Sequence, residues 1–310
     1  MDPSSLASLS RIAVPATYVV AGALIVAERV ALHAMRRPRR ARQALASLAS
    51  GAMAFGLLAI ASRLLFVHVM TRAWSLRAVD LGAGILAWLA AFVVYDFMFW
   101  FAHVAGHRVR VLWCFHSVHH TATEMRLTTA VRGSAFDFVY LPWFFVWIPA
   151  LGVHPAMLLV VESLSRMWGV ATHVSPSIVG RLGALDRALV TPSVHRVHHG
   201  TELAYLDTNY GEVLLLWDRL FGTYAPEREA PTYGVLKPVD PCDVAEVQLS
   251  PWRDLWRDLR RAPTLSARLR YLFDAPGWSH DGEDLRVTTL RRRALYSPTA
   301  AGDPPAPPCP

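Results

Sequence analysis

Lysine is nearly absent from this chain of 310 residues, in which Lys237 is the only lysine and arginine supplies the other cationic side chains. Charged residues are also scarce at 18%, whereas 53% of the residues are hydrophobic and the mean hydropathy is +0.28. A composition this apolar is unusual for a soluble enzyme of this length and indicates a membrane protein. The net charge of +7 comes from arginine. An excess of both arginine and alanine is typical of a biased base composition of the genome, so the charge is a weak sign of nucleic-acid binding. We therefore expect contact with a membrane surface and no nucleic-acid partner.

Cysteine is equally rare, since Cys114, Cys242 and Cys309 are widely spaced and form no CxxC pair. Such an arrangement supports neither a disulfide framework nor a zinc ribbon. We expect Cys114, which lies among histidines, to be a reduced core residue. Residues 1–10 lack a basic side chain, and no small-residue cleavage site follows the first apolar run. This run is therefore predicted to be a retained anchor and not a signal peptide.

Long apolar stretches lie near residues 13–33, 44–70, 79–102 and 136–165. Each approaches the roughly 20 residues that a helix needs to cross the hydrocarbon core of a bilayer. The fourth stretch contains three prolines and a glycine, Pro142, Pro149, Pro155 and Gly152, so we expect it to bend back as a helical hairpin. The sequence thus predicts an all-α integral membrane helical bundle of about four spans, with a cytosolic helical cap.

Arginines are concentrated in one loop of the predicted bundle. Residues 36–42 contain a dense cationic run, whereas the next loop has only Arg72 and Arg77 nearby. By the positive-inside rule the first loop is cytoplasmic. The chain then returns to the cytoplasmic side at His103, and the hairpin brings the later histidines to the same side. We expect an integral membrane protein, of the bacterial inner-membrane type, whose histidines meet at the cytoplasmic end of the helices.

Eight of the thirteen histidines lie in three short motifs. The motifs are His103-Val-Ala-Gly-His107, His116-Ser-Val-His119-His120 and His195-Arg-Val-His198-His199. Residues three and four apart share a helix face, so each motif directs at least two imidazoles toward one point. Imidazole binds iron, zinc, copper and nickel, and eight ligands suit two metal ions better than one. The isolated histidines, His33, His68, His154 and His280, are expected to be ordinary core or surface residues.

The motifs and their flanking residues resemble the fatty acid hydroxylase and sterol desaturase superfamily over about residues 90–240. The similar segments are Trp113–His120, Thr128–Arg132, Thr191–Gly200, Asp207–Gly211 and Trp217–Tyr224. Within the superfamily the resemblance is greatest to bacterial members akin to alkylglycerol monooxygenase and ornithine-lipid hydroxylases. Two positions differ from the family pattern, because Val104 stands where arginine is common and Gly133 to Ala135 stand where a His-Pro pair is common. These differences leave the substrate class open.

The resemblance implies a membrane enzyme with two iron ions that uses dioxygen to attack a C–H bond of a lipid. It also implies an external electron donor, either a separate redox partner or a pterin, and His173 as a ninth ligand by position. Breaking such a bond requires redox-active metal, which zinc does not supply. Hydroxylation and desaturation both remain open, and so does a C–C desaturase that acts on a sterol-like or acyl lipid. The rival functions are a membrane zinc-binding or transport protein and a zinc hydrolase, although nine histidines exceed what a hydrolase needs.

Three polar residues are expected to support the ligands. Asp96, an ionisable group inside an apolar span, resembles a family aspartate and is expected to orient a ligand imidazole through its second nitrogen. Asp207 and Asn209 are expected to act similarly beneath the third motif, although capping a turn explains them equally well. Glu162 either joins this support or only lines the hairpin.

The sequence divides into three predicted parts. Residues 1–78 form membrane anchor helices, 79–240 form the catalytic domain, and 241–310 form a basic C-terminal segment. In that segment Trp252, Leu255, Trp256 and Leu259 have the spacing of an amphipathic helix. This helix lies on the membrane surface or packs on the cap, and residues 296–310 are predicted to be disordered.

Overall fold

The structure is a computed structural model that describes residues 3–37 and 40–296. In these residues every regular element is helical, apart from two isolated β-bridges, so the predicted all-α class is confirmed. The helices are α1 (Pro3–Ala34), α2 (Ala41–Ala61), α3 (Val67–Ser75), α4 (Ile85–Arg108), α5 (Arg110–His120), α6 (Leu127–Ala130), α7 (Pro155–Ala171), α8 (Pro192–His198), α9 (Leu216–Leu220), α10 (Val244–Arg261), α11 (Leu265–Phe273) and α12 (Val287–Tyr296). Shorter turns of helix are η1 (Ser62–Phe66), η2 (Asp137–Val139), η3 (Leu141–Phe144), η4 (Ile148–Leu151) and η5 (Leu185–Arg187).

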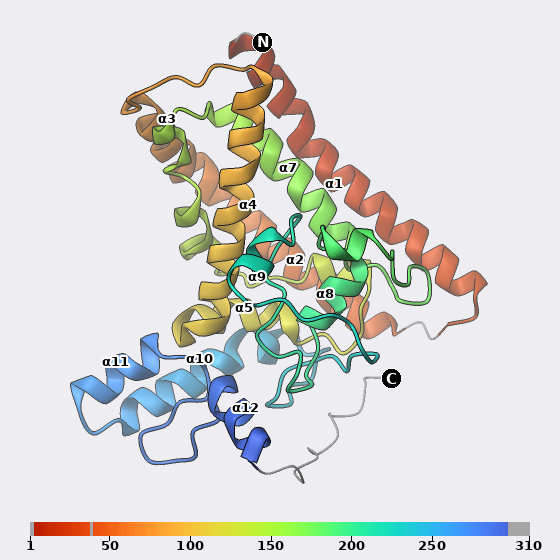
Figure 1. Cartoon of the computed structure of the whole chain (residues 1–310), viewed down its shortest axis with the longest axis vertical. Coiled ribbons are helices and arrows are strands. Elements are labelled where there is room, and N and C mark those ends of the chain that lie inside the picture. The colour runs from red at the N-terminus through yellow and green to blue at the C-terminus, as the bar shows by residue number, and fades with distance from the viewer. Residues whose placement is uncertain (1–2, 38–39, 297–310) are drawn as a thin grey trace.

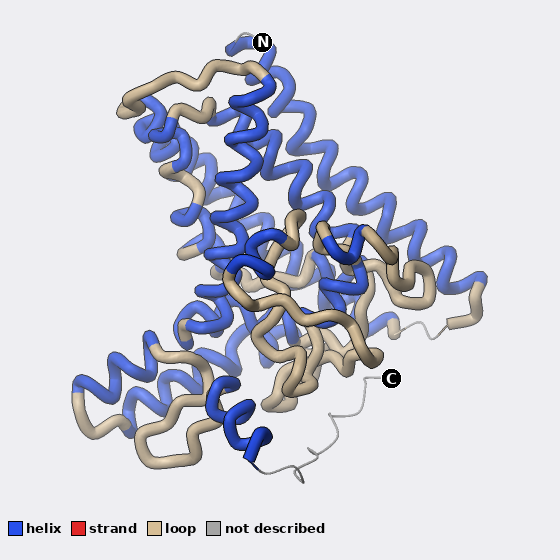
Figure 2. The backbone as a smooth tube through the Cα atoms, viewed as in Figure 1, coloured by secondary structure: helices blue, strands red, loops and turns tan. Residues whose placement is uncertain are grey.

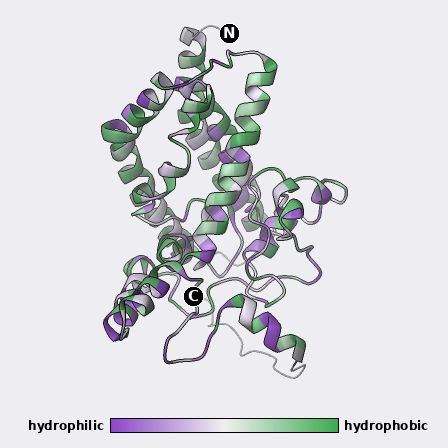
Figure 3. Cartoon of the chain, turned by 60° about the vertical axis from the view of Figure 1, so that its left-hand side comes forward, coloured by the Kyte–Doolittle hydropathy of each residue, from purple (hydrophilic) through white to green (hydrophobic). Residues whose placement is uncertain are grey.

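Three helical segments are long and apolar enough to span a membrane, by length and composition. They are Ser4–Ala34, Ala41–Ser75 and Ile85–Arg108, and the second is continuous because the π-helical turn η1 joins α2 to α3. Figure 3 shows that hydrophobic residues predominate along these helices. The third segment extends further than the sequence predicted. His103 and His107 therefore lie in the last two turns of α4 and not beyond its end.

The fourth apolar stretch does not form one helix, as its prolines and glycine predicted. It divides into the short helices η2, η3 and η4 and then α7. Gly152 ends η4 with a φ of +96°, and a Cβ at this position would lie 2.6 Å from the carbonyl oxygen of Val79. Only glycine fits this left-handed, closely packed turn. After the turn α7 runs back against α1 and α4.

The core that supports the site lies between α4, α7 and the hairpin. Tyr95, Ile148 and Met157 are fully buried there, and α1 covers the outer side of α7 (Figure 1). Figure 2 shows that the loops gather at one end of the long helices, around α8 and α9. The histidine-bearing helices α5 and α8 lie at this same end. The prediction that the histidine motifs meet at one end of the helices is thus confirmed.

The amphipathic helix α10 packs on the rest of the chain. Leu255 and Leu259 contact α5 and α11 in a cluster that includes Cys114 and Tyr271, whereas Trp256 is exposed. Of the two alternatives that the sequence left open, packing on the rest of the chain holds for the two leucines, because they pack against α5 and α11. Residues 297–310, most of the segment predicted to be disordered, lie outside the described residues.

Cys114 is the cysteine for which the sequence made a structural prediction. Cys114 is free and buried, as expected.

Candidate metal centre

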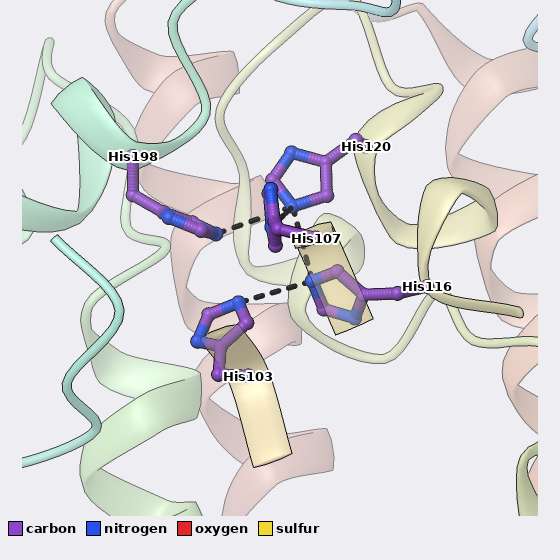
Figure 4. A group of neighbouring side chains, drawn as sticks. All are labelled: His103, His107, His116, His120 and His198. Carbon is purple, nitrogen blue, oxygen red and sulfur yellow. Dashed lines mark hydrogen bonds between the residues drawn. The ribbon is translucent and has the colours of Figure 1, made fainter. Parts of the chain in front are cut away.

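Nine histidine side chains meet where α4, α5 and α8 converge with the turn after α7. Their ligand nitrogens form two groups, and within each group all of these atoms lie within 4.8 Å of one another. Group 1 contains His103, His107, His116, His120 and His198 (Figure 4), and group 2 contains His119, His173, His195 and His199. The structure therefore brings together all eight motif histidines and His173.

The spacing within each motif decides which group a histidine joins. Residues four apart stay in one group, as His116 and His120 do in group 1 and His195 and His199 do in group 2. The remaining histidine of each HxxHH motif, one residue before the last, joins the other group. It does so because a shift of one residue turns the side chain by about 100° around the helix. Each HxxHH motif thus contributes to both groups.

The Nε2 atoms face one another at short distances in both groups. In group 1 the separations are 3.0 Å between His103 and His116, and 3.2 Å for the pairs His107–His120, His116–His120 and His120–His198. In group 2 they are 3.1 Å for His119–His173, 2.9 Å for His173–His195 and 3.1 Å for His195–His199.

Contacts at the second ring nitrogen fix the tautomer of several histidines. His119 donates from Nδ1 to the carbonyl oxygen of Arg132 at 3.0 Å, and His173 donates from Nδ1 to that of Gly169 at 2.7 Å. In a neutral ring the Nε2 atom then carries a lone pair and no proton. Two lone pairs 3.1 Å apart repel each other, so a hydrogen bond does not explain this contact. A cation between the rings would.

The donor set fits a metal ion on this evidence of geometry and charge. With a metal–nitrogen distance of about 2.1 Å, neighbouring ligands of an octahedral ion are about 3.0 Å apart. The Nε2 separations of 2.9 to 3.2 Å agree with that value. A metal ion requires its histidine ligands to be neutral, and burial favours the neutral form of these imidazoles. Two adjacent groups of five and four such ligands accommodate two ions.

Burial in this site disfavours the charged form of the histidines. It lowers the pKa of His119 to about 4, and it lowers the pKa of the six other grouped histidines that lie outside the candidate spans, His116, His120, His173, His195, His198 and His199. Neighbouring imidazoles add to the effect in those six.

Acidification is expected to destabilise the metal-free protein. At pH values between the unfolded pKa near 6.5 and the lower folded pKa values, the unfolded chain binds more protons than the folded protein. The free energy of unfolding therefore decreases as the pH is lowered, by up to about 1.4 kcal/mol per pH unit for each histidine. We expect a lower thermal unfolding midpoint of the metal-free protein at pH 5.5 than at pH 7.5, and loss of bound metal from the metal-loaded protein at pH 5.5. Unchanged midpoints and metal content would contradict buried neutral histidines.

Asp207 is the expected supporting residue that the structure places against a ligand. Its Oδ1 atom lies 3.4 Å from Nδ1 of His107. Burial raises the pKa of Asp207 to about 6, while Arg108 and Arg291 lower it. Asp207 has a φ of +54°, in the left-handed region, which aspartate tolerates better than most residues other than glycine.

Asp96 and Asn209 do not contact a ligand imidazole. Asp96 accepts hydrogen bonds from the backbone of Val213 and Leu214 and, at 2.9 Å, from the indole of Trp217. Asn209 bonds the backbone of Val194 and Ala225. The prediction of a direct hydrogen bond from Asp96 to an imidazole is therefore wrong. The carboxylate instead binds the segment that follows residue 210. Both residues instead hold that loop and α8 in place.

Asp218 is a supporting residue that the sequence did not single out. Its fully buried carboxylate accepts bonds from the backbone of Tyr210 and Gly211, each at 2.8 Å, and from the side chains of Trp100 and Thr223. The carbonyl oxygen of Tyr210 in turn accepts from His103 Nδ1 at 2.7 Å. The only sequence signal was its place in the Trp217–Tyr224 motif.

Arg132 and Glu28 also support the site through backbone contacts. The guanidinium of Arg132 is buried and donates to Val118, Thr121, Ser47 and Pro241, and its own carbonyl oxygen accepts from His119. The carboxylate of Glu28, on α1, accepts from the backbone of Leu127 and Ser175, each at 2.8 Å. These residues connect the first two helices to the turns that carry ligands.

The isolated histidines do not join either group. His154 caps α7 by accepting from the backbone of Ala156, and His280 contacts Tyr271. His33 and His68 lie on α1 and α3. Neither is part of the two groups, as expected.

A family model and several known proteins are similar to this chain. Residues 88–223 match the family model described as fatty acid hydroxylase. Alkylglycerol monooxygenase of Xenopus tropicalis is 34% identical over 191 residues, which cover 62% of this chain and 42% of that protein. The human alkylglycerol monooxygenase is 32% identical with the same coverage. Ornithine lipid hydroxylase OlsE of Rhizobium tropici is 32% identical over 133 residues, covering 43% of this chain and 40% of that protein.

The matches have defined limits. The chain spans about two fifths of the length of these relatives, as the coverage of 42% and 40% shows. No solved structure matches the chain. The matched residues 88–223 nevertheless contain both histidine groups, Asp96 and Asp218.

Proposed function

We propose that the chain is a di-iron lipid hydroxylase, because residues 88–223 match the fatty acid hydroxylase family model and the similar proteins are named as lipid monooxygenases and hydroxylases. The observation that carries the proposal is the presence of two groups of imidazoles, one of five histidines and one of four, within these residues. We propose iron as the metal in both, held by His103, His107, His116, His120 and His198 in one group and by His119, His173, His195 and His199 in the other.

Iron would supply the dioxygen activation and redox chemistry that no amino-acid side chain provides. The residues of this chain hold and orient it. Carbonyl oxygens fix the Nδ1–H side of His103, His119 and His198, which points their Nε2 lone pairs inward. The aromatic rings of Trp113 and Tyr210 pack against His107 and limit water access on that side.

The overall reaction requires electrons from outside the domain. Hydroxylation converts a C–H bond to C–OH and reduces the second oxygen atom of dioxygen to water, which consumes two electrons and two protons. We propose an external electron donor, either a separate redox partner or a pterin. A desaturase, in which a second hydrogen leaves the lipid, is the alternative outcome of the same site.

The substrate is proposed to be a membrane lipid. The relatives are named for alkylglycerols and ornithine lipids, and we propose a lipid of this kind for the present chain. The three apolar helices support an integral membrane location. We further propose that the protein lies in a bacterial-type inner membrane, with the cationic loop at 36–42 and the metal centre on the cytoplasmic side. We also propose that residues 1–78 anchor the protein in the membrane, that residues 79–240 form the catalytic part and that residues 241–310 form a C-terminal segment.

Metal analysis tests the proposed centre. We expect the purified protein to contain about two iron ions per chain, which is the number that two imidazole groups accommodate. About one zinc ion and no iron would instead support a zinc hydrolase or a zinc-binding protein.

Lipid mass spectrometry tests the reaction. Cells that express the chain are expected to contain a lipid that is one oxygen atom heavier than in cells without it. A loss of two hydrogens would assign desaturation. Unchanged lipids, with intact iron, would refute both oxidative functions.

A further inference from the structure

The segment that follows α8 contacts the second ring nitrogen of three histidines of group 1. We call residues 201–210 the ligand loop. The contacts are from Nδ1 of His103 to the carbonyl oxygen of Tyr210 at 2.7 Å, from Nδ1 of His107 to Oδ1 of Asp207 at 3.4 Å, and from Nδ1 of His198 to the carbonyl oxygen of Thr208 at 2.9 Å. In group 2, His119 and His173 instead donate to Arg132 and Gly169, which lie outside this loop. The ligand loop therefore acts on group 1 in particular.

A residue of the C-terminal helix holds the middle of the ligand loop. Arg291 lies on α12, beyond the part of the chain that matches the family model. Its Nε donates to the carbonyl oxygen of Leu203 at 3.2 Å, and its Nη2 donates to that of Leu206. The guanidinium also acts electrostatically on the carboxylate of Asp207. Two hydrogen bonds and a charge interaction from one planar cation thus fix the turn that presents this carboxylate to group 1.

Helix α12 is itself fixed to a helix that carries ligands. Arg286, just before α12, pairs with Asp274 at 3.1 Å. The carbonyl oxygen of Asp274 accepts from the backbone of Arg110 at 3.0 Å, and Arg110 is the first residue of α5. The C-terminal helix therefore connects the start of α5 to the ligand loop. Figure 1 shows α12 at the end of the long helices where the loops gather.

The contacts of α12 are polar. Of residues 287–295 only Thr289 is buried, and its hydroxyl donates to Asp284 at 2.8 Å. Leu295 is 81% exposed. Because residues 287–295 add no apolar side chain to the buried core, replacing Arg291 removes hydrogen bonds and leaves that core intact.

The two ends of the ligand loop are held independently of Arg291. At the first end the backbone of Thr201 donates to the carbonyl oxygen of Thr232 at 2.9 Å. Near the last end the backbone of Asn209 donates to the carbonyl oxygen of Thr223, also at 2.9 Å. Loss of the Arg291 contacts is therefore expected to leave the loop attached and to shift its middle, which presents the carboxylate to group 1.

We propose that Arg291 is a positioning residue for the ligands of group 1. It holds the ligand loop from the C-terminal helix and thereby fixes the imidazoles of His103, His107 and His198. This assignment rests on the proposed metal centre and deepens it. Removing the outer partner of a ligand usually weakens metal binding by about 10–100-fold, and Arg291 acts through the loop, so we expect the lower end of this range. The C-terminal segment thus controls one group of histidines and not the other.

Cobalt titration of the full-length protein in detergent, after a chelator has removed its metal, tests the proposal without turnover. Co²⁺ bound by imidazoles absorbs visible light, so the two groups are followed as two binding events. His198→Ala is expected to abolish the event of group 1, and His119→Ala that of group 2, which assigns them. Arg291→Gln is expected to weaken the group 1 event about tenfold and to leave the group 2 event unchanged. Arg291→Lys keeps the charge and one donor and is expected to recover part of the affinity.

A neighbouring arginine supplies the matched control. Arg292 is exposed on the same helix, and Arg292→Gln changes the net charge equally, so we expect it to change neither event. Asp207→Asn is expected to weaken the group 1 event. The double variant with Arg291→Gln is expected to weaken it by less than the product of the two single effects, because both substitutions act on His107 through one loop. All variants are expected to keep the wild-type helical content by circular dichroism.

The outcomes separate a positioning role from a general structural one and from the proposed function. An unchanged group 1 event in Arg291→Gln, an equal loss at both groups, or the same loss in Arg292→Gln would overturn the role of Arg291. If Arg291→Gln does not fold, Arg291→Lys makes the same comparison with a smaller expected loss that is confined to group 1. A wild-type protein that binds two cobalt ions in this way, but is isolated without iron and forms no product, would instead overturn the proposed function and leave the role of Arg291 intact.

Discussion

His119→Ala and His198→Ala are each expected to abolish product formation while the protein remains folded. The two histidines belong to different groups, His198 to group 1 and His119 to group 2. Each substitution removes one imidazole from one group, so iron content is expected to fall from about two ions per chain toward one. Since losing an outer partner of a ligand already costs about 10–100-fold in activity or affinity, losing the ligand is expected to cost more.

The measurements are product formation, iron content and helical content by circular dichroism for each variant. His68→Ala is the matched control, because His68 is exposed on α3 and lies in neither group. We expect it to retain iron and activity. Retained product formation in His119→Ala or His198→Ala, with normal helical content, would refute the assignment of that histidine as a ligand.

The histidines of the two groups could be singled out from the sequence because their arrangement within each motif is local. The spacings HxxxH and HxxHH place imidazoles on one helix face whatever the surrounding fold is. Which histidines share a group could not be predicted in this way. It depends on how α4, α5 and α8 cross, and only the structure places His198 beside His120 and His119 beside His173.

The supporting carboxylates show the opposite case. Asp96 was predicted from its unusual position within an apolar span, but its partners, Val213 and Trp217, are 117 and 121 residues away in the sequence. No local pattern specifies such partners. Asp218 was missed because it lies in an ordinary polar position of a short helix, and its burial arises only when α4 and the loop after residue 208 pack together.

The amphipathic helix α10 was ambiguous for a physical reason. A face of tryptophan and leucine side chains with arginines between them suits a membrane surface and a protein core equally well. Tertiary packing decides, and here α5 and α11 cover Leu255. The bent hairpin was predictable, by contrast, because proline and glycine act on the backbone locally.

Asp218→Ala is expected to be the most destabilising single substitution outside the ligands. Two backbone amides, one indole and one hydroxyl donate to this carboxylate, and in the alanine variant all four lose their acceptor in a buried place. At about 1–3 kcal/mol for each unsatisfied group, the total exceeds about 4 kcal/mol, a large part of the stability of a typical domain. We expect little folded protein to accumulate.

Asp218→Asn keeps the shape and separates folding from metal binding. The amide retains one oxygen but turns an NH₂ group toward donors, so we expect a loss of about 2–4 kcal/mol in the free energy of unfolding. Because the Tyr210 carbonyl would then hold His103 less firmly, iron content is expected to fall as well. Denaturant unfolding and metal analysis measure the two effects. Asp281→Asn, whose side chain is 65% exposed, is the control and is expected to change stability by less than about 0.5 kcal/mol. Equal stability of the two variants would show that Asp218 does not hold the loop beneath His103.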